Sequence, residues 1–330
     1  MTDRHLYLDN LTGLLILDMI FFVHVRDAAG VTEGVVPFLA NLMCFFMAWF
    51  FFKSGMFYKR ERFRDRIRKD AGSLLLPYAV STFFTLVIYY VFVGHNYPLV
   101  EVAKKALLDI YLDEAITWNA ALWFLPSLFI VKALANVCIP RIGSVATLVT
   151  ALAASFLLNR FHFTHPIVFG NVALGLAFYT LGHLLKDIQF NKWVFLTSAA
   201  GYLAGLGFTA CHFFDFRCNT VGQADSYPLV IVFLLAGIIT FDNVFRKCFD
   251  KRIPLLTGLG RKSIIPYTVH YPFIVLFVKT LSPAASGLSE YSFWLILSIL
   301  TALCITTAIW SASKSALRIR TAPDKRPQKP

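Results

Sequence analysis

Asp18 and His24 interrupt the apolar run within GLLILDMIFFVHVRD, residues 13–27, near the N-terminus. The imidazole of His24 can take up or release a proton near neutral pH, and His24 is therefore a candidate general base. Asp27 follows three residues later and is a candidate partner that orients the ring and stabilises its protonated form. The alternative for His24 is an interfacial histidine at a helix end, without a chemical role.

Helical geometry sorts the polar residues of this stretch by direction. At about 100° per residue, Asp9, Asn10 and Asp27 point roughly the same way as His24. We therefore expect one stripe along the helix that is polar at both ends. Asp18 points about 120° away from that stripe. It is expected to pair with a polar group on a neighbouring helix, or to be protonated.

The composition indicates that these residues lie in a membrane protein. The chain has 330 residues, of which 57% are hydrophobic and only 15% are charged, with 33 phenylalanines. These values predict an all-α polytopic membrane protein, because a soluble chain of this length needs more charge. Runs of about 20 apolar residues can cross the bilayer, and about ten transmembrane helices are expected, near 8–26, 36–57, 73–94, 120–138, 143–159, 167–185, 193–213, 227–245, 258–280 and 291–313.

The distribution of Lys and Arg predicts the orientation of the spans. If the N-terminus is cytoplasmic, the most basic segments, KRERFRDRIRK at 59–69 and the tail at 314–330, also lie in the cytoplasm. Both termini are then cytoplasmic, and we expect a multi-pass protein of the inner (cytoplasmic) membrane. The net charge of +12 is assigned to this topology and to membrane lipid headgroups rather than to nucleic acid.

Three segments of the chain follow from composition. Residues 1–313 are expected to form a single transmembrane domain, followed by a basic, disordered cytoplasmic tail over 314–330. The segment 95–118 alternates apolar and charged residues at helical spacing, which predicts an amphipathic helix on the outer surface.

Four stretches in order resemble the integral-membrane acyltransferase family 3. They are LDNLTGLLILDMIFFVH (8–24), FFFKSGMF (50–57), ALWFLPSLFI (121–130) and LGRKSIIPYTVHYPFI (259–274). The resemblance covers essentially the whole chain, and the wording of the first motif is similar to the branch that includes fucose 4-O-acetylase-like proteins. One departure is Gly13, which stands where relatives usually carry a basic residue. Lys53 lies at a similar expected depth and is a candidate substitute, the alternative being a lysine that reaches to the interface.

The resemblance implies an O-acyltransferase that moves an acyl group, commonly acetyl from acetyl-CoA, to a hydroxyl of a cell-envelope glycan or lipid-linked sugar acceptor. His24 would then be the general base and Asp27 its partner, with an acyl-histidine intermediate as an alternative to direct transfer. The acyl donor would be bound by basic side chains at the end of the second span and in the loop at 59–69. The alternative for the loop residues is an ordinary cluster of positive charge on the cytoplasmic side of the membrane. The candidates for donor binding are Lys53, Arg64, Arg66 and Arg68.

Other polar residues are candidates for the pocket. Ser54, Trp123 and Ser263 are possible donors to the oxyanion of a tetrahedral intermediate, and Asp9 and Asn10 stand at the inner end of the stripe. His270 falls near mid-depth of its span, where an imidazole needs a hydrogen-bonding partner; its role is either in the pocket or in packing. No metal-ligand spacing is visible. A transporter of glycan or acyl intermediates is the alternative function, because polar residues inside spans also mark transport pathways. The oligomeric state is left open.

Overall fold

The described part of the chain consists of helices and their connections. The computed structural model describes residues 5–92, 97–163, 165–209, 227–282 and 287–321, without the side chains of 207–209 and 311–321, and these residues contain no strand. The elements in chain order are α1 (Leu6–Leu17), η1 (Asp18–Val25), α2 (Arg26–Ala29), α3 (Val35–Leu42), α4 (Phe46–Met56), α5 (Phe63–Asp70), η2 (Ala71–Leu75), α6 (Leu76–Phe92), α7 (Leu99–Asp113), η4 (Thr117–Trp123), α8 (Phe124–Ile142), α9 (Ser144–Arg160), α10 (Val168–Leu185), α11 (Lys192–Thr209), α12 (Tyr227–Cys248), α13 (Pro254–Arg261), α14 (Ile264–Leu281) and α15 (Glu290–Thr321).

Eight helical stretches among the described residues are long and apolar enough to cross a membrane. The prediction of an all-α polytopic membrane protein is thereby confirmed, with eight such stretches against the ten runs expected. The run at 143–159 forms α9, whose 17 residues span only about 25 Å at 1.5 Å per residue, less than the hydrocarbon thickness. The run at 193–213 corresponds to α11, which ends at Thr209; residues 210–226 lie outside the described part.

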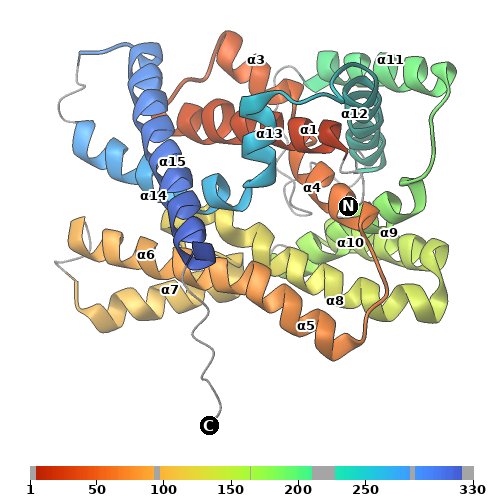
Figure 1. Cartoon of the computed structure of the whole chain (residues 1–330), viewed down its shortest axis with the longest axis horizontal. Helices are drawn as coiled ribbons and strands as arrows, with labels where there is room; N and C mark the ends of the chain where they lie inside the picture. Colours follow the sequence, from red (N-terminus) through yellow and green to blue (C-terminus); the bar gives the residue numbers. More distant parts are fainter. Residues whose placement is uncertain (1–4, 93–96, 164, 210–226, 283–286, 322–330) are drawn as a thin grey trace.

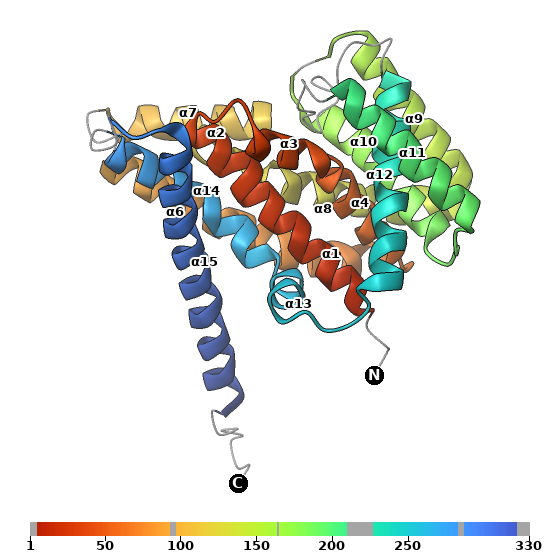
Figure 2. The same ribbon diagram turned by 90° about the horizontal axis from the view of Figure 1, so that it is seen from above.

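Glycines allow the central helices to approach closely. A side chain at Gly55 of α4 would overlap the carbonyl oxygen of Tyr179 in α10, and one at Gly182 of α10 would overlap that of Phe52 in α4. Small residues at such crossings let two backbones come into contact inside a membrane. Both views place α4 and α10 next to each other near the middle of the molecule (Figure 1, Figure 2).

The first span runs through the body of the protein and changes helical form on the way. Figure 2 shows α1 running diagonally, with α13 and α14 alongside it. The α-helix ends at Leu17, and Asp18–Val25 form a π-helix. Because a π-helix bonds each residue to the fifth along the chain, the stripe expected from α-helical geometry applies only to α1. π-helical segments are frequent at functional sites, and this one contains His24.

The segments at the edges of the fold are also helical. α7 occupies most of the expected amphipathic segment, with Val102 and Ala106 buried and Leu107 and Tyr111 exposed. α15 continues to Thr321, so part of the tail that was expected to be disordered, 314–321, is helical; residues 322–330 lie outside the described part. The C-terminal end of α15 projects away from the other helices (Figure 2).

Candidate active site

Two histidines from opposite ends of the chain meet inside the helical body. Nδ1 of His24, in η1, lies 2.8 Å from Nε2 of His270, in α14. Their rings are nearly parallel, with an interplanar angle of 11° and centroids 5.0 Å apart. His270 is completely buried, whereas His24 remains partly accessible. His24 is therefore the more exposed member of the pair, and His270 contacts it from the interior.

The partners of His270 determine which nitrogen of His24 carries a proton. Nδ1 of His270 lies 2.9 Å from the carbonyl oxygen of Pro266. A carbonyl only accepts, so Nδ1 of His270 is the protonated nitrogen, and in the neutral ring Nε2 is an acceptor. Nδ1 of His24 must then donate to it. The lone pair of neutral His24 is consequently on Nε2, the arrangement needed in a general base.

Contacts from neighbouring helices fix the surroundings of this histidine pair. The ring of Tyr271 is nearly perpendicular to that of His24, with centroids 5.1 Å apart and an interplanar angle of 83°. Nε1 of Trp294, in α15, donates to the carbonyl oxygen of Phe21 at 2.9 Å. The latter bond ties the π-helical segment to another span. Both interactions limit rotation of the element that carries His24.

Asp27 is not the partner that was expected for the His24 ring. It accepts a hydrogen bond from Nε of Arg26 at 2.9 Å, and its side chain is 55% exposed. Nδ1 of His24 is instead engaged with Nε2 of His270. The orienting contact therefore comes from His270. Asp18 is buried and interacts electrostatically with Arg26.

The inner end of the expected stripe joins α1 to the segment around α13. Asp9 is buried and lies 3.0 Å from Nε of Arg261. Asn10 donates to the carbonyl oxygens of Phe249 and Lys251, both at 2.7 Å, and accepts from Thr257 at 2.6 Å. Both the nitrogen and the oxygen of the Asn10 amide are therefore hydrogen-bonded. Asn10 thus anchors the 249–257 segment to α1.

Lys53, in α4, contacts α1 next to Gly13. A side chain at Gly13 would overlap the carbonyl oxygen of Leu256 in α13, so this position has no room for the basic residue that relatives usually carry. Nζ of Lys53, from α4, lies 2.5 Å from Oγ1 of Thr12 and 3.5 Å from the carbonyl oxygen of Leu8. A cation therefore reaches the level of Gly13 from a neighbouring helix. Ser54 follows Lys53 and is partly exposed.

The three arginines expected to bind a donor have different environments. Arg66 is buried in α5, with Nε 2.5 Å from Asp70 and a hydrogen bond of 3.3 Å to the Tyr179 hydroxyl. Its guanidinium is thus occupied in linking α5 to α10. Arg64 and Arg68 are exposed.

A second basic surface lies beside α5. A groove of about 500 Å³ runs between the segment before α5 and the end of α8, and Arg60, Arg62, Asn136 and Arg141 line it. Glu61 also belongs to its lining, and a hydrogen bond from Lys69 holds the pKa of Glu61 below its usual range. Arg141 is distant from the basic loop in sequence, and its position after an apolar run is the only sequence signal for its contribution.

Trp123 and Ser263 occupy the starts of two spans. Trp123 is buried at the end of η4, with its ring edge-on to Phe124 at 6.2 Å. Ser263 precedes α14, and its carbonyl oxygen accepts a 3.1 Å hydrogen bond from the backbone N–H of Tyr267. The hydroxyl of Tyr267 in turn donates a hydrogen bond to the carbonyl oxygen of Ala121. This bond connects the start of α14 to η4.

Sequence reasoning did not indicate a buried carboxylate, Glu114, that contacts the N-terminal part of α8. Glu114 has φ 56° and accepts hydrogen bonds from the Ser127 hydroxyl at 2.8 and 2.7 Å and from the Asn171 amide at 2.9 Å. Its carbonyl accepts from the Tyr78 hydroxyl at 3.0 Å. Glu114 therefore joins α6, α8 and α10. A lone glutamate in a loop gives no sequence signal for such a role.

Residues 5–312 match the family described as an acyltransferase domain, acyltransferase family 3. The chain belongs to this family. The match spans both histidines and all the motifs that suggested the resemblance, so an acyltransferase activity is supported for this architecture. No curated protein and no solved structure matches the chain. In the part of the chain that the structure describes, no group of three metal-ligating side chains gathers.

Proposed function

We propose that the protein is a membrane-bound O-acyltransferase that transfers an acetyl group from acetyl-CoA to a hydroxyl of a cell-envelope glycan. The observation that carries this proposal is the contact between His24 Nδ1 and His270 Nε2, within a chain of the acyltransferase family. It leaves the second nitrogen of a partly exposed imidazole to accept a proton. We further infer that the protein works in the inner membrane, with the basic loop on the cytoplasmic side.

In this mechanism His24 Nε2 removes the proton of the acceptor hydroxyl as its oxygen attacks the thioester carbonyl. The C–O bond forms, the C–S bond then breaks, and the thiolate of CoA leaves with the proton from His24. A hydroxyl is a poor nucleophile until its proton is being transferred, and a positioned base accelerates this step by about 10²–10⁴-fold. His270 is a positioning residue, because it holds His24 in the required tautomer without touching substrate.

The groove lined by Arg60, Arg62 and Arg141 suits the charged end of the donor. Three guanidinium groups offer bidentate hydrogen bonds to phosphate oxygens, and the groove volume of about 500 Å³ lies within the usual range of about 300–1,000 Å³ for small-molecule sites. Arg64 and Arg68 are exposed on the adjacent helix α5 and would add to the positive field. Lys53 is proposed to contact the donor nearer the membrane interior, and Ser54, Trp123 and Ser263 remain the proposed donors to the oxyanion.

The proposal is tested with purified protein in lipid vesicles, labelled acetyl-CoA and candidate envelope glycans. Wild-type protein should form acetylated glycan, and His24→Ala should lose the activity at matched protein abundance and unchanged unfolding temperature. Arg160→Ala, an exposed change at the far end of α9, serves as the control. Uptake of a glycan into vesicles, with no acetylated product from any donor, would instead identify a transporter.

A further inference from the structure

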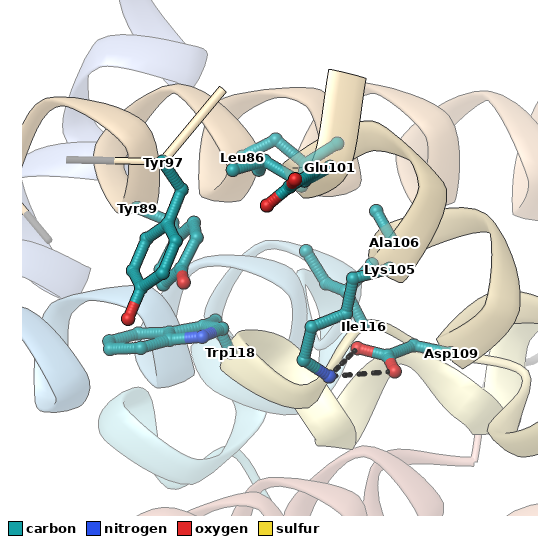
Figure 3. Close-up of a pocket in the computed structure, with 10 residues that line it drawn as sticks. Leu86, Tyr89, Tyr97, Glu101, Lys105, Ala106, Asp109, Ile116 and Trp118 are labelled. Carbon is teal, nitrogen blue, oxygen red and sulfur yellow. Dashed lines mark hydrogen bonds and ion pairs between the residues drawn. The ribbon is translucent and has the colours of Figure 1, made fainter. Parts of the chain in front are cut away.

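A cleft on the side of α7 has the composition of a ligand site. Figure 3 shows it between α6, α7 and η4, with the rings of Tyr89, Tyr97 and Trp118 on one side and Glu101, Lys105 and Asp109 on the other. Its volume is about 420 Å³, within the usual range of about 300–1,000 Å³ for small-molecule sites. The cleft lies between the C-terminal part of α6 and most of the length of α7, and it shares no lining residue with the basic groove beside α5.

Hydrogen bonds hold the polar wall of the cleft in place. Nζ of Lys105 lies 3.0 Å from Oδ1 of Asp109, and Oδ2 of Asp109 accepts hydrogen bonds from the hydroxyl and the backbone N–H of Thr117 at 2.7 and 3.2 Å. These bonds connect α7 to the start of η4. The residue after Thr117 is Trp118, so the same contacts fix the position of the indole. The polar wall is thereby preorganised.

The aromatic wall is also fixed. The rings of Tyr89 and Trp118 have centroids 4.3 Å apart and are tilted by 50°. Nζ of Lys279, in α14, lies 5.7 Å from the centre of the Trp118 ring. Figure 3 shows the three aromatic rings grouped at one side of the cleft, across from Lys105 and Asp109.

This combination fits a neutral saccharide. A pyranose ring presents C–H groups on its face, which pack against aromatic rings, and hydroxyls on its edge, which both donate and accept hydrogen bonds. Glu101 and Asp109 supply acceptors and Lys105 supplies a donor. The lining carries two carboxylates against one ammonium, and that ammonium is already paired with Asp109. The lining of the cleft therefore offers a phosphate no ammonium group that is not already paired, which disfavours a phospholipid headgroup.

The cleft borders the element that carries His270. Tyr89 and Trp118 also line a narrow crevice whose other wall includes Pro272 of α14. Pro272 is two residues after His270 in the same helix. Asn119, next to Trp118, is buried and donates to Ser81 and Thr85 of α6 at 3.2 and 3.1 Å. The cleft and the histidine pair are thus built on a shared framework of α6, η4 and α14.

We propose that the cleft of Tyr89, Tyr97, Trp118, Glu101, Lys105 and Asp109 is a saccharide subsite that binds the acceptor glycan. The inference rests on the proposed function, because it assigns the cleft to the acceptor of that reaction. A sugar bound here would be recognised by its ring face and hydroxyl edge. The neighbouring sugar of the same glycan would present its hydroxyl to His24.

The subsite is tested by binding, separately from catalysis. Full-length protein in lipid nanodiscs is titrated with methyl glycosides of a hexose, a 6-deoxyhexose and an N-acetylhexosamine, and binding is followed by saturation-transfer NMR. We expect wild type to bind at least one of them, and Trp118→Ala to weaken that binding by about fivefold or more. Trp118→Phe keeps an aromatic face and should retain most of the affinity. Tyr111→Ala, on the exposed side of α7, should bind as wild type.

Catalytic variants separate this inference from the proposed function. His24→Ala should bind the glycoside as wild type does while forming no acetylated product. Glycoside binding that depends on Trp118, without transfer to any glycan in wild type, would support a saccharide site and refute the proposed transfer to a glycan hydroxyl. The subsite is refuted if none of the three glycosides binds, if Trp118→Ala binds as tightly as wild type, or if inorganic phosphate displaces the glycoside.

Discussion

The carbonyl oxygen of Pro266 lies 2.9 Å from Nδ1 of His270, and this hydrogen bond also determines the tautomer of His24. It orders the protons along a chain of three groups, from His24 Nδ1 to His270 Nε2 and from His270 Nδ1 to Pro266. The free lone pair of His24 is therefore on the nitrogen farthest from the carbonyl. A backbone group, which no side-chain substitution removes, sets the state of the proposed base.

Substitutions of His270 test this proton order. His270→Ala should lower kcat by about tenfold or more, because one hydrogen bond to the base is lost and Nδ1 of His24 can then be the basic nitrogen. His270→Gln should recover part of the rate, since its side-chain oxygen can accept the His24 proton. KM for both substrates should change little. Equal rates for His270→Ala and wild type would contradict the positioning role.

The contact between α1 and α13 predicts opposite effects for two glycines. Gly13→Ala should destabilise the protein by about 1–3 kcal/mol, because the new methyl group overlaps the carbonyl oxygen of Leu256. Gly258→Ala is the matched control in α13, where a Cβ meets no atom within 4 Å; it should be neutral or stabilising by up to about 1 kcal/mol through helix propensity. Unfolding temperatures in a single detergent compare the two variants. The packing argument fails if Gly13→Ala is as stable as wild type.

Arg141 is expected to affect the donor more than the acceptor. Arg141→Ala removes one of three guanidinium groups from the basic groove and should raise KM for acetyl-CoA by about tenfold, with little effect on kcat. KM for the donor should also rise with salt in wild type and less steeply in the variant. An unchanged KM would place the donor elsewhere, for instance near Arg64 and Arg68.

The environment of Asp109 predicts that the free energy of unfolding falls in acid. Burial raises the pKa of its carboxyl, but hydrogen bonds from Thr117 and Lys105 outweigh burial and leave the pKa below its usual value. The folded state therefore binds this proton less readily than the unfolded state. Its contribution to stability is present above the unfolded pKa, about 3.9, and is lost as pH falls through the folded pKa.

The measurement compares unfolding temperature between about pH 6 and pH 3. Asp109→Asn should show a smaller decrease across this range than wild type. Asp65→Asn, a change at an exposed carboxylate in α5, serves as the control and should follow the wild-type curve. Parallel curves for wild type and Asp109→Asn would exclude this linkage.

The sequence was sufficient for the fold class and for His24 as a candidate, but not for the partner of that residue. Apolar runs identify spans directly because each must cover the bilayer. The contact of His24 with His270 joins positions 246 residues apart, and hydropathy carries no information on which spans are neighbours. Asp27 was chosen on α-helical geometry, which the π-helix of Asp18–Val25 does not follow.

Polar residues of α1 show a second limit of sequence reasoning. Asn10 and Asp9 inside an apolar span resemble pocket residues, yet Asn10 is occupied by three bonds to the 249–257 segment and Asp9 by Arg261. A membrane-buried polar group needs a partner whether or not it has a chemical role. Sequence alone does not distinguish a catalytic partner from a structural one. Arg66 was likewise a candidate for binding the acyl donor, and its guanidinium forms an ion pair with Asp70.

The distance in sequence between His24 and His270 has a consequence for biosynthesis. The first span enters the membrane early, whereas α14 is synthesised only after most of the chain. A nascent or prematurely terminated protein that stops before residue 270 carries His24 without the group that fixes its proton. Such fragments lack the contact between His24 and His270, so we expect activity only after the late spans have been synthesised and inserted.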